Sequence, residues 1–222
     1  MTDRPILMSA PMVGALLAGT KTQTRRIIKP RHNPNRPNLF DGTWSDSYVL
    51  DPGNQKWRDD AYSWRVGDCL WVREALAADH NDQGMRWISY AADHAVPPDL
   101  GNMVWSWRRP TLPSIHMPRW ASRLTLTVTG VKVERLRDIS EVDAWDEGII
   151  SFHRSAERLD WPGASDGDVA AAIIETYGSA RDAFRDLWEY INGPGSWEAN
   201  PWVVALTFAV HTQNIDALKE AV

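Results

Sequence analysis

The sequence contains one cysteine, Cys69, among 222 residues. Intrachain disulfides and zinc sites made of several cysteines are therefore excluded, and we expect a protein of the reducing cytoplasm. The six histidines lie far apart and form no HExxH-type pair, so we expect no metal and no cofactor. No window approaches the roughly 18 apolar residues of a membrane span, and residues 3–5 begin no long apolar core. We therefore expect neither a membrane partner nor a secretory signal.

Acidic residues outnumber basic ones, 29 to 24, yet residues 20–36 hold six Lys and Arg and no carboxylate. The acidic stretch at 141–189 favours a localised basic surface over a uniform one. Hydrophobic residues make up 43% of the chain, which is enough for the core of one globular domain. Thirteen tryptophans are present, and both core packing and base stacking explain such residues.

The local patterns predict an α+β fold. Leu124, Leu126 and Val128 alternate with threonines, and the phase shifts after Gly130, which predicts a strand with a bulge. Further strands are expected at 69–73 and 204–210, and residues 31–63 and 77–118 are expected to be long loops. Helices are expected after Ser9, after Ser140 with an end at Gly148, and at 168–191 in one or two pieces around Gly178.

Four motifs occur in order along the chain: "LLAGTKTQTRR" (16–26), "VGDCLWVRE" (66–74), "LTVTGVKVERLRDISEVDAWDEGI" (126–149) and "NPWVVALTF" (200–208). Together they resemble the ASCH domain family of the PUA-like superfamily, and residues 113–123 and 184–202 look like its phage and prophage branch. The resemblance implies a small PUA-like β-barrel flanked by helices, in a single domain over 1–222 with insertions at about 31–63, 77–118 and 150–180. It also implies a bacterial or phage-infected cell and a cleft for nucleotides or RNA.

Some compact ASCH proteins are amidohydrolases that remove the acyl group from N4-acylated cytidine. By the resemblance, the catalytic residues are Lys21, Thr24 and Glu147, and the substrate is a modified cytidine nucleoside or base. A Thr hydroxyl needs a base, and a Lys is a base only when it is neutral. Burial and nearby cations such as Arg25 and Arg26 lower a Lys pKa, and Glu147 is expected to orient Lys21 or to carry the proton.

One geometric condition applies to this assignment. Side chains three residues apart on a straight strand point to opposite faces, so Lys21 and Thr24 meet only if the chain turns or bulges after Gly19. Ordinary alternatives also stand: a solvated basic surface for the Lys and Arg, an exposed strand for the threonines, and a solvated helix face for Glu147.

Two further groups of residues are candidates for contacts. Arg26, Arg73 and Glu74 are predicted to contact the substrate, although a structural ion pair explains the last two equally well. Arg25, Arg108, Arg109 and Arg119 are predicted nucleic-acid contacts, the last three because they lie among tryptophans. A loop that packs over the barrel is the alternative for this region.

A non-catalytic RNA- or DNA-binding module is the competing function, and single-stranded nucleic acid is the partner that it implies. Nuclease activity is a third possibility, but the sequence offers no carboxylate cluster or His pair for it. A phage-type protein acting on a modified base in a genome is a fourth. Three roles are open for the long loops: to cap the cleft, to extend it for a polynucleotide, or to widen its acyl pocket.

Overall fold

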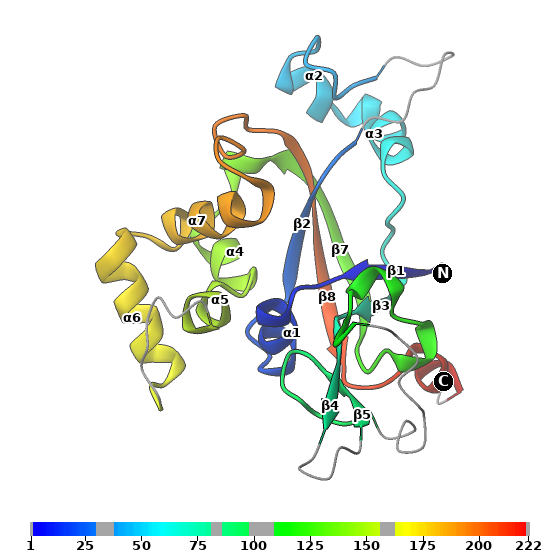
Figure 1. Ribbon diagram of the computed structural model, residues 1–222. Helices are drawn as coiled ribbons and strands as arrows, with labels where there is room; N and C mark the ends of the chain where they lie inside the picture. Colours follow the sequence, from blue (N-terminus) through cyan, green and yellow to red (C-terminus); the bar gives the residue numbers. More distant parts are fainter. Residues whose placement is uncertain (1, 30–37, 81–85, 98–108, 156–162, 221–222) are drawn as a thin grey trace.

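The computed structural model describes residues 2–29, 38–80, 86–97, 109–155 and 163–220 (Figure 1). Within these residues, no helix has the length and apolar character needed to cross a membrane. The predicted nucleic-acid contact Arg108 lies outside the described residues.

The main sheet has five strands in the order β1-β3-β7-β8-β2. Their bounds are β1 Asp3–Leu7, β2 Gln23–Ile27, β3 Cys69–Arg73, β7 Thr125–Arg135 and β8 Trp202–His211. Neighbours pair antiparallel except β1 and β3, which pair parallel. The strands predicted from hydrophobic alternation are confirmed, and β1 was missed.

The long strand β7 bends at the predicted glycine. Its register against β8 shifts between Val128 and Gly130. A Cβ at Gly130 would lie 3.3 Å from the Thr207 Cβ, so the glycine lets the two backbones approach closely. Leu126 is buried before the bulge, as the alternation predicted.

The expected closed barrel is not formed by the described strands, because β1 and β2 are the two edges of the sheet. The Arg26 side chain spans this gap: its Nη2 donates to the Leu7 carbonyl oxygen at 3.0 Å. Leu7 thus accepts a guanidinium N–H where a barrel would supply a backbone N–H from a neighbouring strand. The α+β class is confirmed, with a sheet that remains open between β1 and β2.

Residues 77–118 were predicted to be irregular, which is wrong for the part that the structure describes. A second sheet, in the order β5-β4-β6, contains β4 Leu76–His80, β5 Arg86–Tyr90 and β6 Thr111–Leu112. It packs on its own small core, which includes Ile88, Tyr90 and Met117. In Figure 1, β4 and β5 lie at the opposite end of the long strands from α2 and α3.

The predicted loop at 31–63 also contains helices, α2 Asp46–Leu50 and α3 Gln55–Ala61. The Ser45 side chain caps α2 by accepting from the Tyr48 N–H at 3.3 Å, and Val49 packs in the main core. We call residues 38–64 the arm. Val49 therefore fixes the arm to the main hydrophobic core.

The remaining helices are α1 Ala10–Leu17, α4 Glu141–Asp146, α5 Ile149–Ser155, α6 Asp166–Tyr177, α7 Ala180–Asn192 and α8 Ile215–Glu220. The predicted boundaries at Ser140, Gly148 and Gly178 are confirmed: the serine accepts from the Asp143 N–H, and both glycines have positive φ. Helices α4 to α7 pack on one another and lie on one side of β2 (Figure 1). Short 3₁₀ helices occur at Pro52–Asn54, Ser114–His116, Arg119–Ala121 and Leu136–Asp138.

Candidate active site

The segment between α1 and β2 fixes the position of Lys21. Gly19 adopts a φ of 73°, which turns the chain after α1. Lys21 then forms an isolated antiparallel bridge with Glu147, and the Thr22 N–H donates to the Asp146 carbonyl at 3.0 Å. The register between β2 and β8 begins at Gln23, opposite Thr207. Lys21 therefore precedes the strand, and the two-residue period of β2 does not set the direction of its side chain relative to Thr24.

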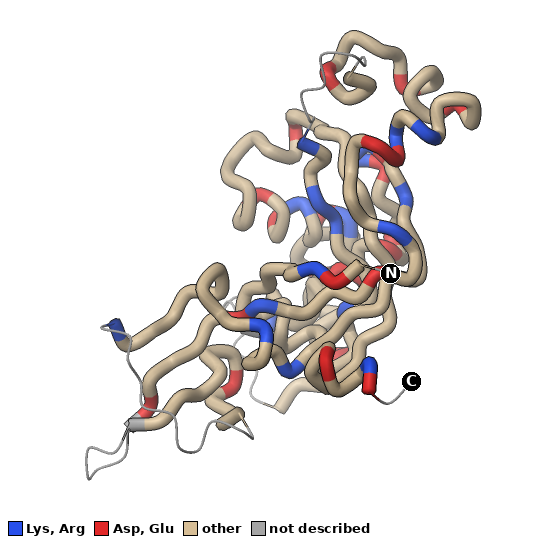
Figure 2. The backbone as a smooth tube through the Cα atoms, turned by 90° about the vertical axis from the view of Figure 1, so that its right-hand side faces the viewer, with Lys and Arg blue, Asp and Glu red and all other residues tan. Residues whose placement is uncertain are grey.

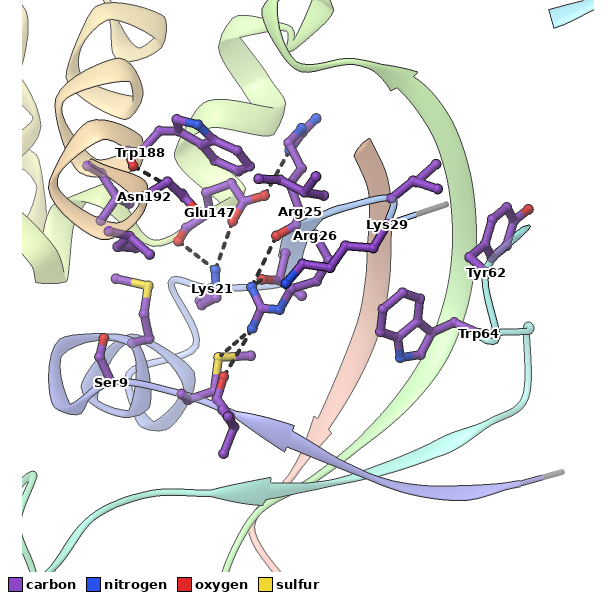
Figure 3. A pocket seen from close by; sticks show the side chains of 18 of the residues that line it. Ser9, Lys21, Arg25, Arg26, Lys29, Tyr62, Trp64, Glu147, Trp188 and Asn192 are labelled. Atoms are coloured by element: carbon purple, nitrogen blue, oxygen red, sulfur yellow. Dashed lines mark hydrogen bonds and ion pairs between the residues drawn. The ribbon is translucent and has the colours of Figure 1, made fainter. Parts of the chain in front are cut away.

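Glu147 accepts bonds from two buried cations. Lys21 Nζ donates to the Glu147 carbonyl oxygen at 2.8 Å and to Oε2 at 3.0 Å. Arg25 Nη1 donates to the other carboxylate oxygen, Oε1, at 3.0 Å. All three residues are buried, Lys21 to 1% exposure. In Figure 3, Lys21 and Glu147 point toward each other among the side chains that line a cavity. Glu147 therefore does not lie on a solvated helix face, the alternative considered above.

Gly148 permits this arrangement because it has no side chain. Its φ is 82°, and a Cβ there would lie 2.8 Å from the Ala15 Cβ and 3.0 Å from the Lys21 Cβ. Ala15 belongs to α1, so an added side chain at position 148 would collide with α1 and also with Lys21. The glycine therefore lets two segments meet where Lys21 and Glu147 pair.

We expect Gly148→Ala to lower the free energy of unfolding by about 2–4 kcal/mol, because it combines left-handed strain with overpacking. Gly178→Ala is the matched control: φ is 81° there, but no atom lies within 4 Å of the added Cβ. Denaturant unfolding measures both variants. Equal losses in the two would contradict the assigned close approach.

Arg25 holds Glu147 in place through a network of buried hydrogen bonds. Its Nε and Nη2 donate to Glu134 Oε1 at 3.0 and 2.7 Å, and Nη2 also donates to Asp143 Oδ2 at 3.2 Å. Its Nη1 donates to Gln23 Oε1 and to Glu147. These bonds use all five donors of the guanidinium, and the side chain is fully buried. No donor of Arg25 is left to face solvent, so its hydrogen bonds leave none for the predicted contact with nucleic acid.

Burial lowers the pKa of the Lys21 ammonium, and the nearby Arg26 and Arg25 guanidinium groups lower it further. Glu147 opposes both effects because its carboxylate favours the charged lysine. The net direction is downward, toward a neutral amine. A neutral lysine keeps two N–H donors, which match its two bonds to Glu147, and gains a lone pair. The environment is thus suited to a lysine that accepts a proton.

Thr24 lies in β2 and is buried, and its hydroxyl accepts from Arg26 Nη1 at 2.9 Å. Both Thr24 and Lys21 line the same cavity, although no hydrogen bond joins them within the described residues. The cavity brings together Lys21, Thr24, Glu147 and Arg26 of the predicted site.

The cavity has a volume of about 830 Å³, within the range typical of small-molecule sites. Four aromatic side chains line it: Tyr62 and Trp64 from the end of the arm, and Phe184 and Trp188 from α7. In Figure 3, Tyr62 and Trp64 lie on one side and Trp188 on the other. The sequence analysis did not assign these residues to the site, because only the tertiary fold brings the two segments together.

Arg73 and Glu74 do not line this cavity. Glu74 is buried and accepts two bonds from Arg123, at 2.8 and 2.9 Å, and Arg123 also pairs with Asp93. Arg73 donates to the carbonyl oxygens of Met117 and Ile115. Neither residue is therefore placed to contact a substrate held in this cavity. The structural alternative holds for Glu74, with Arg123 as its partner instead of Arg73.

The predicted basic loop is only partly described. Arg109 is exposed, and Arg119 pairs with Asp3 at 2.8 Å and with Asp216. Figure 2 shows basic and acidic residues interspersed over most of the described chain in that view. Arg119 is already neutralised by its two carboxylate partners.

Comparisons with known proteins add no assignment. No protein-family model matches the chain, and no curated protein or solved structure gives a significant match. Among the described residues, no three His, Cys, Asp or Glu side chains gather in an arrangement that holds a metal ion.

Proposed function

We propose that the chain is an amidohydrolase of the ASCH and PUA-like type, which removes the acyl group from N4-acylated cytidine. The observation that carries the proposal is the buried Lys21–Glu147 pair, placed in one cavity with the Thr24 hydroxyl. The open sheet would be a variant of the PUA-like barrel in which the Arg26 side chain joins the two edge strands.

The proposed reaction starts with Thr24. Its Oγ1 attacks the acyl carbon while its proton moves to the neutral Lys21 amine. Arg26 Nη1 lies 2.9 Å from Thr24 Oγ1, and in the proposed reaction it stabilises the negative charge that develops on the acyl oxygen. The bond between the acyl carbon and N4 then breaks, and Lys21 gives its proton to N4, which releases cytidine. An acyl ester remains on Thr24.

Water completes the cycle. It attacks the ester carbon, Lys21 takes its proton, and that proton returns to Thr24 Oγ1 as the carboxylic acid leaves. Glu147 acts as a positioning residue, since both of its bonds to Lys21 Nζ fix the direction of the lone pair. No cofactor takes part in these steps.

The test is a chromatographic assay of purified protein with N4-acetylcytidine. We expect cytidine from the wild type and a fall of at least about 10³-fold in Thr24→Ala, because the nucleophile is removed. Thr22→Ala is the matched control: it changes the same residue type two positions away, and Thr22 does not line the cavity. Absence of turnover by the wild type with nucleosides and bases acylated at N4 would refute the proposal.

The competing proposal, a non-catalytic nucleic-acid-binding module, has weaker support. The buried donors of Arg25 and the ion pairs of Arg119 remove two of the cations on which it rested. Binding of RNA or DNA with a steep salt dependence, without hydrolysis, would favour it.

A further inference from the structure

Two walls of different chemical character face the cavity. The side chains of one wall come from α1 and α7, and we call them the helix wall: Met12, Phe184, Leu187, Trp188 and Ile191. All five are hydrophobic, and the first four are buried members of the main hydrophobic core. The arm forms the other wall with Tyr62, Ser63 and Trp64, which are half-buried. One wall is therefore apolar and largely shielded from water, and the other is partly open to it.

The apolar surface reaches the groups of the proposed reaction. The buried Met8 lines the cavity just before α1, and its Sδ lies 3.9 Å from Arg26 Nη2. The same guanidinium donates to Thr24 Oγ1 at 2.9 Å through Nη1. On the side of α7, the Phe184 ring centroid lies 5.9 Å from the guanidinium carbon of Arg25. Apolar side chains thus continue from α1 and α7 to the nucleophile and to the arginine network.

The reacting groups lie on the side of the helix wall. In Figure 3, Trp188 and Glu147 are on the same side of the cavity, across from Tyr62 and Trp64. A substrate amide that meets Thr24 therefore has the helix wall on one side and the arm on the other. Each half of the substrate then contacts a different wall, and the chemistry of the walls decides which half lies where.

The two halves of an N4-acylated cytidine differ as the two walls do. Cytosine O2 and N3 and the ribose hydroxyls need hydrogen-bond partners, because burial without them costs free energy. The half-buried arm leaves these groups in contact with water, and Tyr62 and Trp64 supply aromatic rings on which a base stacks. An aliphatic acyl chain has no polar group beyond its carbonyl, so it suits the helix wall. The cavity, at about 830 Å³, is larger than an acetylated nucleoside and has room for a longer chain.

We propose that the helix wall is an acyl-binding pocket, so that the protein prefers cytidines whose N4-acyl group is an aliphatic chain longer than acetyl. The inference rests on the proposed function, because Thr24 as nucleophile fixes where the amide lies. Leu187 and Ile191 are four residues apart on α7 and both line the cavity, so they share one face of the helix. Leu187 is buried and Ile191 is 57% exposed, which places Ile191 at the rim, where a longer chain ends.

The experiment measures equilibrium binding by calorimetry to the Thr24→Ala variant, which lacks the proposed nucleophile and so leaves the ligand intact. The probes are N4-acetylcytidine, N4-butanoylcytidine and N4-hexanoylcytidine. Each buried methylene strengthens binding about fourfold. We therefore expect the butanoyl compound to bind at least about tenfold more tightly than the acetyl compound, and the hexanoyl compound to bind more tightly still.

Ile191→Asn, in the same background, should lower the ratio of the hexanoyl to the acetyl affinity at least about threefold, because an amide of similar size replaces apolar surface at the rim. Ile174→Asn is the matched control: Ile174 is also exposed, but it belongs to α6 and does not line the cavity. Equal affinities for the three ligands, weaker binding of the longer chains, no binding, or an unchanged ratio in Ile191→Asn would each overturn the pocket.

Hydrolysis by the wild type is recorded separately, so the pocket and the hydrolase proposal fail in different ways. Affinity that rises with chain length in a wild type that hydrolyses none of the ligands would support the pocket and refute the hydrolase. Hydrolysis of N4-acetylcytidine together with equal affinities for all three ligands would support the hydrolase and overturn the pocket.

Discussion

Lys21→Met is expected to abolish hydrolysis of N4-acetylcytidine, with a loss of about 10³-fold or more. Methionine keeps the length and apolar body of the side chain and removes the amine that we propose as the acceptor of the Thr24 proton. General-base catalysis contributes roughly 10²–10⁴-fold, and in the proposed reaction the same group also protonates the leaving amine. The measurement is the single-turnover rate of cytidine release, with circular dichroism to verify the fold.

Lys21→Arg separates the chemical role from the structural one. Arginine keeps N–H donors beside Glu147, but its guanidinium does not lose a proton in proteins and so cannot act as a base. We expect this variant to be as inactive as Lys21→Met, although its Glu147 pair is retained. Near-wild-type activity in Lys21→Arg would show that position 21 supplies charge and not a base.

The pH profile tests the same role without a mutation. Burial lowers the pKa of Lys21, and the amine acts as a base only in its neutral form. The wild-type rate is therefore expected to rise with pH and to level off above that lowered pKa. A rate that falls as the pH rises through this range would contradict a neutral lysine base.

Arg25→Ala is expected to lower the free energy of unfolding by about 3–5 kcal/mol, as removal of one partner of a buried ion pair does. The change leaves Glu134 without its bonds from Arg25, and takes from Glu147 one of its two cations. Denaturant unfolding, followed by tryptophan fluorescence, measures the loss. Arg25→Lys should recover little, because one ammonium does not supply five donors in a planar fork.

Arg137→Ala is the matched control for this prediction. Arg137 pairs with Glu198 at 3.3 Å, but both side chains are about half exposed to solvent. Exposed pairs contribute about 0–1 kcal/mol because water screens them and side-chain entropy opposes them. If Arg25→Ala cost no more than Arg137→Ala, the buried network would not stabilise the fold.

Elements with a clear local signal could be predicted from the sequence. Strand β3 matches its predicted bounds, and the bulge at Gly130 and the cap at Ser140 were found because each depends on neighbouring residues. Strand β1 was missed because it contains Pro5, which is tolerated at a sheet edge but weakens a strand pattern. Strand β4, "LAADH", has no alternation, and its second-sheet partners β5 and β6 come later in the chain.

The candidate site depends on contacts that no local pattern contains. Lys21 and Glu147 are 126 residues apart, and the resemblance to a family suggested their pairing where periodicity could not. Arg25 looked like a surface cation because its three carboxylate partners are distant in sequence. Adjacent Arg73 and Glu74 looked like partners, but successive residues of a strand point to opposite sides, and Glu74 meets Arg123 instead.

The separation of these partners has a consequence for how the protein is made. Strand β2 pairs with β8, the last of the described strands in sequence order, so β2 lacks this partner until residues 202–211 have been synthesised. Such non-local pairing closes long loops and slows folding. Lys21 is synthesised first, Glu147 much later, and β8, the partner of β2, later still. A nascent fragment that ends before β8 would therefore carry the Lys21 motif without the strand that holds β2 in the sheet.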